Sequence, residues 1–317
     1  MQIFAEEICY KLQHMLQDKK EIHGTVHSVF NRVCNITFKD WPIVSLILDS
    51  IPMKPMAISL KPLGNISMHE LGFVAVQEVL YYQHRLEIPK AGFTLYLGAS
   101  RGVDCSPVFN INRGSINQIK LNIHELRLVL EQGNSMGLLP VVSKFEEAAG
   151  ENYKTFTPNR YSEFAWPRVN NLIWAIRQCD LIEIANASRG IAGFGPGLTP
   201  SSDDMLIGLM ISLIYASYCY SWDKERVEAI NSAILKGAEG RTTQLSYEMM
   251  GYAAKGEVTN NIHRLMSCIY SNSTKLIYEN ALDVMDYGET SGSDMLCGIY
   301  MGCKTYKSMQ ENKLYIK

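Results

Sequence analysis

The stretch from Ile191 to Gly208, IAGFGPGLTPSSDDMLIG, carries the strongest organising signal in this 317-residue chain. Three alternating glycines lead into a Thr-Pro turn, two serines, two aspartates and an apolar run. A glycine-rich loop before a helix start is typical of an anion-binding site, because backbone N–H groups and the positive helix end face the ligand. Two carboxylates at the mouth of such a loop would repel an anion, so the loop alone does not explain the pattern.

The end of this stretch is repeated later in the chain as GETSGSDMLCG, residues 288–298. Matching the D-M-L-x-G segments pairs Asp204 with Asp294 and Gly208 with Gly298. Glycines in the apolar part of each copy allow two helices to approach closely. The repeat therefore predicts two helices that lie side by side, with their N-termini converging on one pocket.

Both copies also carry N-terminal helix signals. Thr199 can cap the first helix, with Pro200 at its first position, where a missing N–H costs nothing. Thr290 can cap the second helix in the same way.

The aspartates are the candidate catalytic residues. Asp203 and Asp204 point about 100° apart on a helix, so one faces the pocket while the other can cap backbone N–H groups. Mg²⁺ is the candidate cofactor, held by Asp204 and Asp294, since it prefers a few carboxylates together with waters and substrate oxygens. The alternative is a tight turn between packed helices, with the acidic residues placed for the helix dipole.

A third segment, GRTTQLS at residues 240–246, lies between the two copies. Arg241 in a glycine turn before a helix start is suited to bidentate contact with a carboxylate or phosphate. A solvated arginine beside an ordinary helix cap is the alternative. The candidate substrate-binding or anion-binding residues are Gly193, Gly195, Gly197, Thr199, Ser201, Ser202, Arg241, Thr242, Thr243, Thr290 and Ser291.

The rest of the chain predicts an α+β fold. Residues 1–115 open with MQIFAEEICYKLQ, interpreted as an amphipathic helix, and continue as short Val-, Ile- and Tyr-rich runs broken by turn residues. Residues 116–317 have helical periodicity, and Met205–Trp222 is expected to be a buried central helix rather than a membrane span. We expect a β-rich N-terminal domain, a small barrel or sandwich with a leading helix, packed on a mostly helical C-terminal domain.

Composition narrows the function classes. The net charge is −2 and the sequence has no cluster of basic residues, which argues against nucleic-acid and membrane partners. The eight cysteines show no C-x-x-C spacing, which favours reduced thiols in a cytoplasmic protein over zinc binding. His27 and Ser28 are neighbours on a predicted strand and should face opposite ways, so they are not expected to form a nucleophile–base pair.

Taken together, G-F-G-P-G-L-T-P-S-S-D-D, T-T-Q-L-S, G-E-T-S-G-S-D-M-L-C-G and the early V-H-S-V-F-N-R resemble a bacterial domain-of-unknown-function family. That family includes the AllH-type subunit of oxamate carbamoyltransferase, from allantoin and purine catabolism. The resemblance covers roughly Gly24 to Gly302. The chain departs from the family pattern at Ser202, where glycine is common, and at Ser293.

The resemblance implies phosphorolysis of oxalurate to oxamate and carbamoyl phosphate, in a multi-subunit complex with companion subunits. It implies a small anionic substrate and phosphate as ligands. For these ligands we expect the Gly193–Gly197 backbone and Arg241 to bind the anions. The residues expected to orient the ureido group are Thr199, Ser201, Asp204, Thr290 and Asp294. Two alternatives stay open: a non-catalytic structural subunit of such a complex, and a phosphate- or nucleotide-handling enzyme that uses the glycine loop and aspartates with Mg²⁺.

Overall fold

The structure is a computed structural model that describes residues 1–133, 135–220 and 223–314, with side chains up to residue 306. It divides into two compact units. The barrel unit comprises Met1–Ser106 and Glu257–Asn260, and the helical unit comprises Pro107–Gly256 and the described chain from Asn261 onward.

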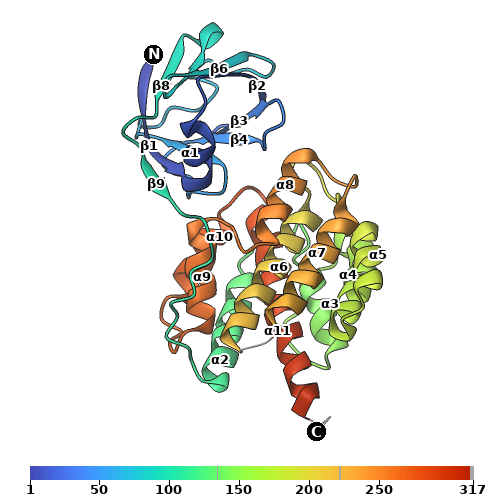
Figure 1. Cartoon of the computed structure of the whole chain (residues 1–317). Coiled ribbons are helices and arrows are strands. Elements are labelled where there is room, and N and C mark those ends of the chain that lie inside the picture. The colour runs from blue at the N-terminus through green and yellow to red at the C-terminus, as the bar shows by residue number, and fades with distance from the viewer. Residues whose placement is uncertain (134, 221–222, 315–317) are drawn as a thin grey trace. The chain divides into compact units, whose positions relative to one another are not determined.

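Strands dominate the barrel unit (Figure 1). Their bounds are β1 Gln2–Cys9, β2 Glu21–Val29, β3 Val33–Phe38, β4 Val44–Ile47, β5 Ala57–Leu60, β6 Glu78–Tyr82, β7 Arg85–Ile88, β8 Phe93–Tyr96 and β9 Arg101–Val103. Hydrogen-bonded neighbours follow the order β5-β4-β3-β2-β6-β7-β8-β1, and β1 pairs back onto β5 to close a mixed barrel. β9 pairs with β1 beyond the end of β8. The predicted α+β organisation is confirmed, and this closure makes the β-rich domain a barrel.

The prediction of a helix at the opening of the chain is wrong for Gln2–Cys9, which form β1. Ile3 and Ala5 are buried while Gln2 and Phe4 are exposed, the period-two alternation of a strand. Pairing with β5 on one edge and with β8 and β9 on the other satisfies the backbone of β1 and overrides local helix propensity. The helix begins only afterwards, as α1 Tyr10–Gln17.

His27 and Ser28 also differ from expectation. The register of β2 against β3 shifts between Val26 and Ser28, which disturbs the strict alternation of side chains. His27 Nδ1 lies 3.1 Å from Ser28 Oγ on the barrel surface. Ser28 Oγ also accepts a hydrogen bond from the Asn35 amide at 2.9 Å, so the serine is part of a polar network between the strands.

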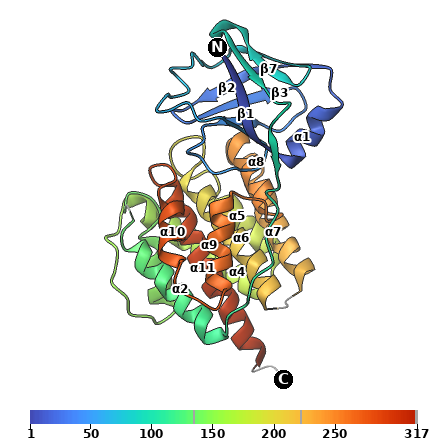
Figure 2. The same ribbon diagram turned by 90° about the vertical axis from the view of Figure 1, so that its left-hand side faces the viewer.

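Apart from α1, and from Asn260 at the start of α9, the described α-helices lie in the helical unit (Figures 1 and 2). Their bounds are α2 Ile116–Leu130, α3 Val141–Ala148, α4 Arg160–Gln178, α5 Leu181–Ile191, α6 Ser201–Cys219, α7 Lys224–Ala238, α8 Gln244–Ala253, α9 Asn260–Tyr270, α10 Ile277–Met285 and α11 Ser291–Leu314. Figure 2 shows α2, α9 and α10 side by side on one face of this unit.

Helix α6 is the core of the helical unit. All of its residues are buried except Ile214 and Tyr218, as expected for a central helix. The last two residues of the predicted run, Ser221 and Trp222, lie outside the described residues. In the described part of the chain, no helix combines the length and hydrophobicity that a bilayer crossing requires.

Helices α6 and α11 pack backbone against backbone in the same direction. A methyl group added at Gly208 would overlap the carbonyl oxygen of Met295, and one added at Gly298 would overlap that of Met205. The repeated glycine of each helix thus faces the repeated methionine of the other. The predicted side-by-side arrangement of the two motif copies is confirmed.

Candidate active site

The N-termini of α6 and α11 meet at one place in the helical unit. Ser201, the first residue of α6, has its hydroxyl 3.5 Å from that of Thr290, which immediately precedes α11. Asp204 and Asp294 each lie in the first turn of their helix, and both are fully buried. The repeated motif therefore places two carboxylates and several hydroxyls in one small volume.

Each of these two carboxylates has an oxygen without a hydrogen bond. Oδ2 of Asp204 and Oδ2 of Asp294 are buried and have no partner among the described residues. Asp294 Oδ1 accepts the backbone N–H of Leu138 at 2.6 Å. Buried polar atoms are normally satisfied, so two orphaned oxygens in one place indicate a site that a ligand completes.

The environment raises the pKa of both carboxyls. Burial is the main cause of the rise in the pKa of Asp204 well above its usual range, and the negative charges of Asp294 and Asp203 add to it. Burial likewise raises the pKa of Asp294 to about 6. The N–H of Leu138 and the nearby hydroxyls of Ser201 and Thr290 have the opposite, smaller effect and lower it. Those hydroxyls lie close enough to lower this pKa, but neither has the geometry of a hydrogen bond to Oδ2.

Asp203 occupies a different environment from its neighbour. Its Oδ1 accepts the N–H of Gly193 at 2.8 Å, and its Oδ2 accepts the hydroxyls of Ser246 at 2.7 Å and of Thr242. These contacts join the glycine loop, α6 and the start of α8. Both carboxylate oxygens of Asp203 thus accept hydrogen bonds from within the chain, and the side chain points away from the pair formed by Asp204 and Asp294.

The glycine loop is partly closed by the chain's own acceptors. The N–H of Gly193 donates to Asp203, and the N–H of Phe194 donates to Ser202 Oγ at 2.9 Å. Ser202 in turn donates its backbone N–H to the Phe194 carbonyl at 3.0 Å. The first part of the loop therefore holds α6 in place.

The second part of the loop lies against the site. Gly195 has φ 128°, and a methyl group there would press on the backbone nitrogen and side chain of Ser201. Gly197 has φ 86° and is exposed. Among the described residues, no acceptor receives the N–H of either glycine.

The expected cap of α6 is not formed by Thr199. Pro200 occupies the N-cap position with no side-chain hydrogen bond, and the helix starts one residue later than predicted. The chain between Gly195 and Pro200 turns against the first residues of α6, with the Ser202 N–H taken by Phe194 rather than by a threonine hydroxyl. Thr199 is a partly exposed residue.

The residues of the third segment, 240–246, have different environments. Thr243 is the N-cap of α8, accepting the Ser246 N–H at 3.1 Å and donating to the Leu198 carbonyl at 2.6 Å. The side chain of Arg241 is exposed, whereas its carbonyl lies against Gly193. Ser291, by contrast, lies within reach of Asp204 and lowers its pKa.

Sequence reasoning missed several residues of the site. Gly137 packs directly on the carboxylate of Asp294, where a side chain would collide, and Leu138 supplies the N–H to it. Tyr287 lies near Asp204, whose charge adds to the effect of burial and raises the pKa of the phenol to about 12. No local pattern marks these positions, because each contributes through a turn that only the fold brings to the helix ends.

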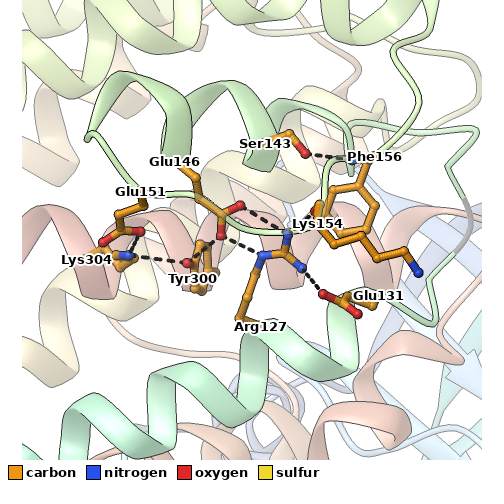
Figure 3. Close-up of polar contacts among 9 residues, drawn as sticks. All are labelled: Arg127, Glu131, Ser143, Glu146, Glu151, Lys154, Phe156, Tyr300 and Lys304. Carbon is orange, nitrogen blue, oxygen red and sulfur yellow. Dashed lines mark hydrogen bonds and ion pairs between the residues drawn. The ribbon is translucent and has the colours of Figure 1, made fainter.

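A second buried polar cluster lies elsewhere along α11 (Figure 3). Arg127 contacts Glu146 through two nitrogens at 2.6 and 3.1 Å, and it also reaches Glu131 and the Lys154 carbonyl. The Tyr300 hydroxyl donates to Glu146 at 2.7 Å. Every member has partners within the chain, so this cluster, called the Arg127 cluster below, joins α2, α3, α11 and the chain before α4.

The donor set at the helix ends is compatible with Mg²⁺. Two orphaned carboxylate oxygens and neighbouring hydroxyls match the few protein ligands that Mg²⁺ uses alongside waters. Within the described residues, no group of three or more His, Cys, Asp or Glu side chains could hold a metal ion. Any such ion would therefore depend on substrate or water oxygens.

The geometry defines a two-unit α+β protein whose buried site lies between the N-termini of two repeated helices. Comparison with known families agrees with the motifs that build it. The family model described as oxamate carbamoyltransferase subunit AllH matches residues 191–303, and the model of the AllH family N-terminal domain matches residues 4–101. The chain belongs to the AllH family. No solved structure matches the chain.

The first match begins at Ile191, contains the glycine loop, both aspartate motifs and the α8 cap, and ends one residue past Gly302. The family is that of a transferase subunit, which implies companion subunits.

Proposed function

We propose that this chain forms the substrate-binding and catalytic wall of an oxamate carbamoyltransferase complex in allantoin and purine catabolism. In the reaction, a phosphate oxygen attacks the carbamoyl carbon of oxalurate, the bond from that carbon to the oxamate nitrogen breaks, and the nitrogen takes up a proton. The products are oxamate and carbamoyl phosphate. The observation that carries this proposal is the pair of buried, incompletely bonded carboxylates of Asp204 and Asp294 within the family's matched region.

A ureido group suits this pair. Its N–H groups are donors that the two orphaned carboxylate oxygens can accept, and its carbonyl is an acceptor that the hydroxyls of Ser201, Thr290 and Ser291 can serve. Burial strengthens each of these contacts, since water does not compete for them. Holding the ureido group in one orientation for attack is a large part of what such a site can contribute to the rate.

The anionic ends of the ligands need other groups. The N–H groups of Gly195 and Gly197 and the exposed guanidinium of Arg241 are the candidates that the geometry leaves for a carboxylate or phosphate. Gly193 and Ser202 are occupied by internal hydrogen bonds, so they support the loop rather than contact a ligand. Asp203, Thr242 and Thr243 act in the same supporting role.

The test is the activity of the reconstituted complex with Asp204→Asn or Asp294→Asn in this chain. We expect kcat/KM for carbamoyl phosphate formation to fall roughly 100-fold or more, as when a group that stabilises the reacting centre is removed. Asp180→Asn is the matched control, because Asp180 is the exposed N-cap of α5 and asparagine caps equally well. Unchanged activity in both site variants would defeat the proposal.

The structure gives one reason to keep a second candidate, a non-catalytic subunit. The first half of the glycine loop is closed by internal hydrogen bonds and serves to pack α6 against α8. If the complex is fully active with both site variants, this candidate is the better explanation. The nucleotide-handling alternative predicts binding of ATP with Mg²⁺ by calorimetry, and binding that is abolished by Asp204→Asn would favour it.

A further inference from the structure

Helix α4 presents an exposed stripe with the spacing of a coiled-coil seam. Successive members are four, three, four, three and four residues apart, the alternation that keeps side chains on one helical face. All six are exposed: Arg160, Phe164, Pro167, Asn171, Trp174 and Gln178. The opposite face of α4 packs on the helical unit through residues such as Val169, Leu172 and Ile176. The helix therefore has one face in the core and a second, exposed seam, on which only Phe164 is shown stacking on another ring, that of Phe194 in the glycine loop, with 4.1 Å between centroids.

The seam and its surroundings expose large apolar side chains, which is unusual for a surface that faces only solvent. Trp174 is 57% exposed and Phe164 is 39% exposed, and the adjoining start of α5 adds Ile182 at 74%. The guanidinium of Arg168 stacks over the Phe164 ring at 3.7 Å from its centroid. Exposed tryptophan, other aromatics and arginine together are typical of the energetically important centre of a protein interface.

One flank of the seam carries charges in an ordered pattern. Glu163, Asn170 and Arg177 are seven residues apart, all exposed, and each precedes a seam position. The flank therefore runs from negative through neutral to positive along the helix. In coiled coils, residues at such flanking positions select the partner and its orientation.

We propose that two copies of this chain associate through α4, in antiparallel orientation about a two-fold axis near Asn170. In that arrangement Phe164 faces Trp174 of the second copy, and Pro167 faces Asn171 of the second copy. Glu163 then faces Arg177 of the second copy, while Asn170 meets its own counterpart. A two-fold axis repeats each contact, so the interface contains two aromatic contacts and two ion pairs.

Helix geometry, the two aromatic residues and the flanking charges together select the register. In two antiparallel helices, each step forward along one seam corresponds to an equal step backward along the other. One pair of facing seam residues therefore fixes all the other seam pairs and the flank residues that meet. The aromatic pair, the central pair and the ion pair all satisfy a single register. A parallel pairing would instead place Arg160 on Arg160, a like-charge contact, and would leave Arg177 far from Glu163, the only carboxylate that α4 of the second copy carries. Charge complementarity thus favours the antiparallel dimer of this chain.

The experiment measures the mass of the full chain by light scattering and sedimentation, from about 1 to about 100 µM. We expect a species of twice the 35.8 kDa chain mass that dissociates on dilution. Trp174→Glu should weaken the dimer by about 30-fold or more, the loss typical of a central interface residue. Leu121→Glu, a change at a residue that is 56% exposed on α2, is the control and should leave the dimer intact.

A charge exchange separates this interface from any other. Glu163→Arg should weaken the dimer by about tenfold, because two like-charged contacts replace two ion pairs. The double variant Glu163→Arg with Arg177→Glu should restore the dimer, since each charge again faces its opposite. A monomeric wild-type chain over the whole range would overturn the proposal, as would a dimer indifferent to Trp174→Glu or a double variant that fails to recover. The mass readout is independent of activity, so this test and that of the proposed function can fail separately.

Discussion

Two clusters of buried charge share helix α11, and they differ in how their polar atoms are partnered. In the Arg127 cluster, Glu146 accepts hydrogen bonds from Arg127 and Tyr300 on its two oxygens (Figure 3). At the start of the same helix, Asp294 and its neighbour Asp204 each keep one buried oxygen without a partner. The central charged groups of both clusters, Arg127 with Glu146 and Asp204 with Asp294, are buried, so burial alone does not distinguish the clusters.

The difference separates structural from functional charge. A satisfied buried ion pair is costly to break, because removing one partner leaves the other uncompensated. A pair of unsatisfied carboxylates already carries a desolvation cost, which the chain retains where the groups are needed for a ligand. Substitutions that remove charge should therefore affect stability with opposite signs at the two clusters.

The largest effect is expected at the Arg127 cluster. Glu146→Gln leaves the fully buried Arg127 guanidinium without its bidentate partner, and we expect the free energy of unfolding to fall by about 3–5 kcal/mol. Urea unfolding followed by circular dichroism measures the change. Glu147→Gln, in the same helix but at a side chain that is 74% exposed, is the control and should change stability by less than about 0.5 kcal/mol. Equal results for the two variants would remove the distinction between the clusters.

The opposite sign is expected at Asp294. Its folded pKa of about 6 exceeds the ordinary 3.8, so the native state binds the proton more tightly. The stability that this group contributes is complete below pH about 4 and is lost as the pH rises through about 6. Asp294→Asn does not titrate, and its amide oxygen can still accept the Leu138 N–H. Relative to wild type, the variant should gain up to about 3 kcal/mol between about pH 4 and pH 7.

This comparison requires unfolding measurements at several pH values in a chelating buffer. Adding Mg²⁺ then tests the candidate cofactor, since an ion held by Asp204 and Asp294 should stabilise wild type and not the variant. A stability difference between the two proteins that does not change with pH would show that Asp294 is ionised normally in the fold.

A smaller effect is expected where α6 and α11 touch. Gly298→Ala would drive a methyl group into the Met205 carbonyl, and overpacking of this kind costs about 1–3 kcal/mol. Gly190→Ala near the end of α5 is the control, because open space surrounds that position, and it should be neutral or stabilising by about 0.5 kcal/mol. Thermal unfolding of both variants decides this. A harmless Gly298→Ala would mean that the helix ends are not held in one position by this contact.

Much of this site could be predicted from local sequence, because repetition exposes what a single motif hides. One D-M-L-x-G segment is uninformative, but two copies with matched glycines specify a close helix pair and bring Asp204 beside Asp294. The pattern could not distinguish Asp203 from Asp204. That distinction depends on Ser246 in α8 and Thr242 in the turn before it, whose hydroxyls satisfy only the first of the two carboxylates.

The remaining errors have related causes. Gln2–Cys9 carries both helical and strand periodicity, and only pairing along both of its edges selects the strand. Gly137 and Leu138 carry no chemical signal, since they contribute a backbone surface and one N–H to Asp294. Backbone contributions of this kind become visible only when the fold places them.

The smallest effect is expected at Thr243, which separates a structural from a ligand-binding role within the predicted site. Its hydroxyl caps α8 and donates to the Leu198 carbonyl, so Thr243→Ala should lower stability by about 1 kcal/mol. Thr243→Ser keeps the hydroxyl and should recover nearly all of that loss. Because the hydroxyl is satisfied within the chain, as in the Arg127 cluster, neither variant should change the KM of the complex for phosphate. A raised KM in Thr243→Ala that Thr243→Ser restores would instead move this residue to the group that contacts the ligand, and the internal hydrogen bonds would then have to open on binding.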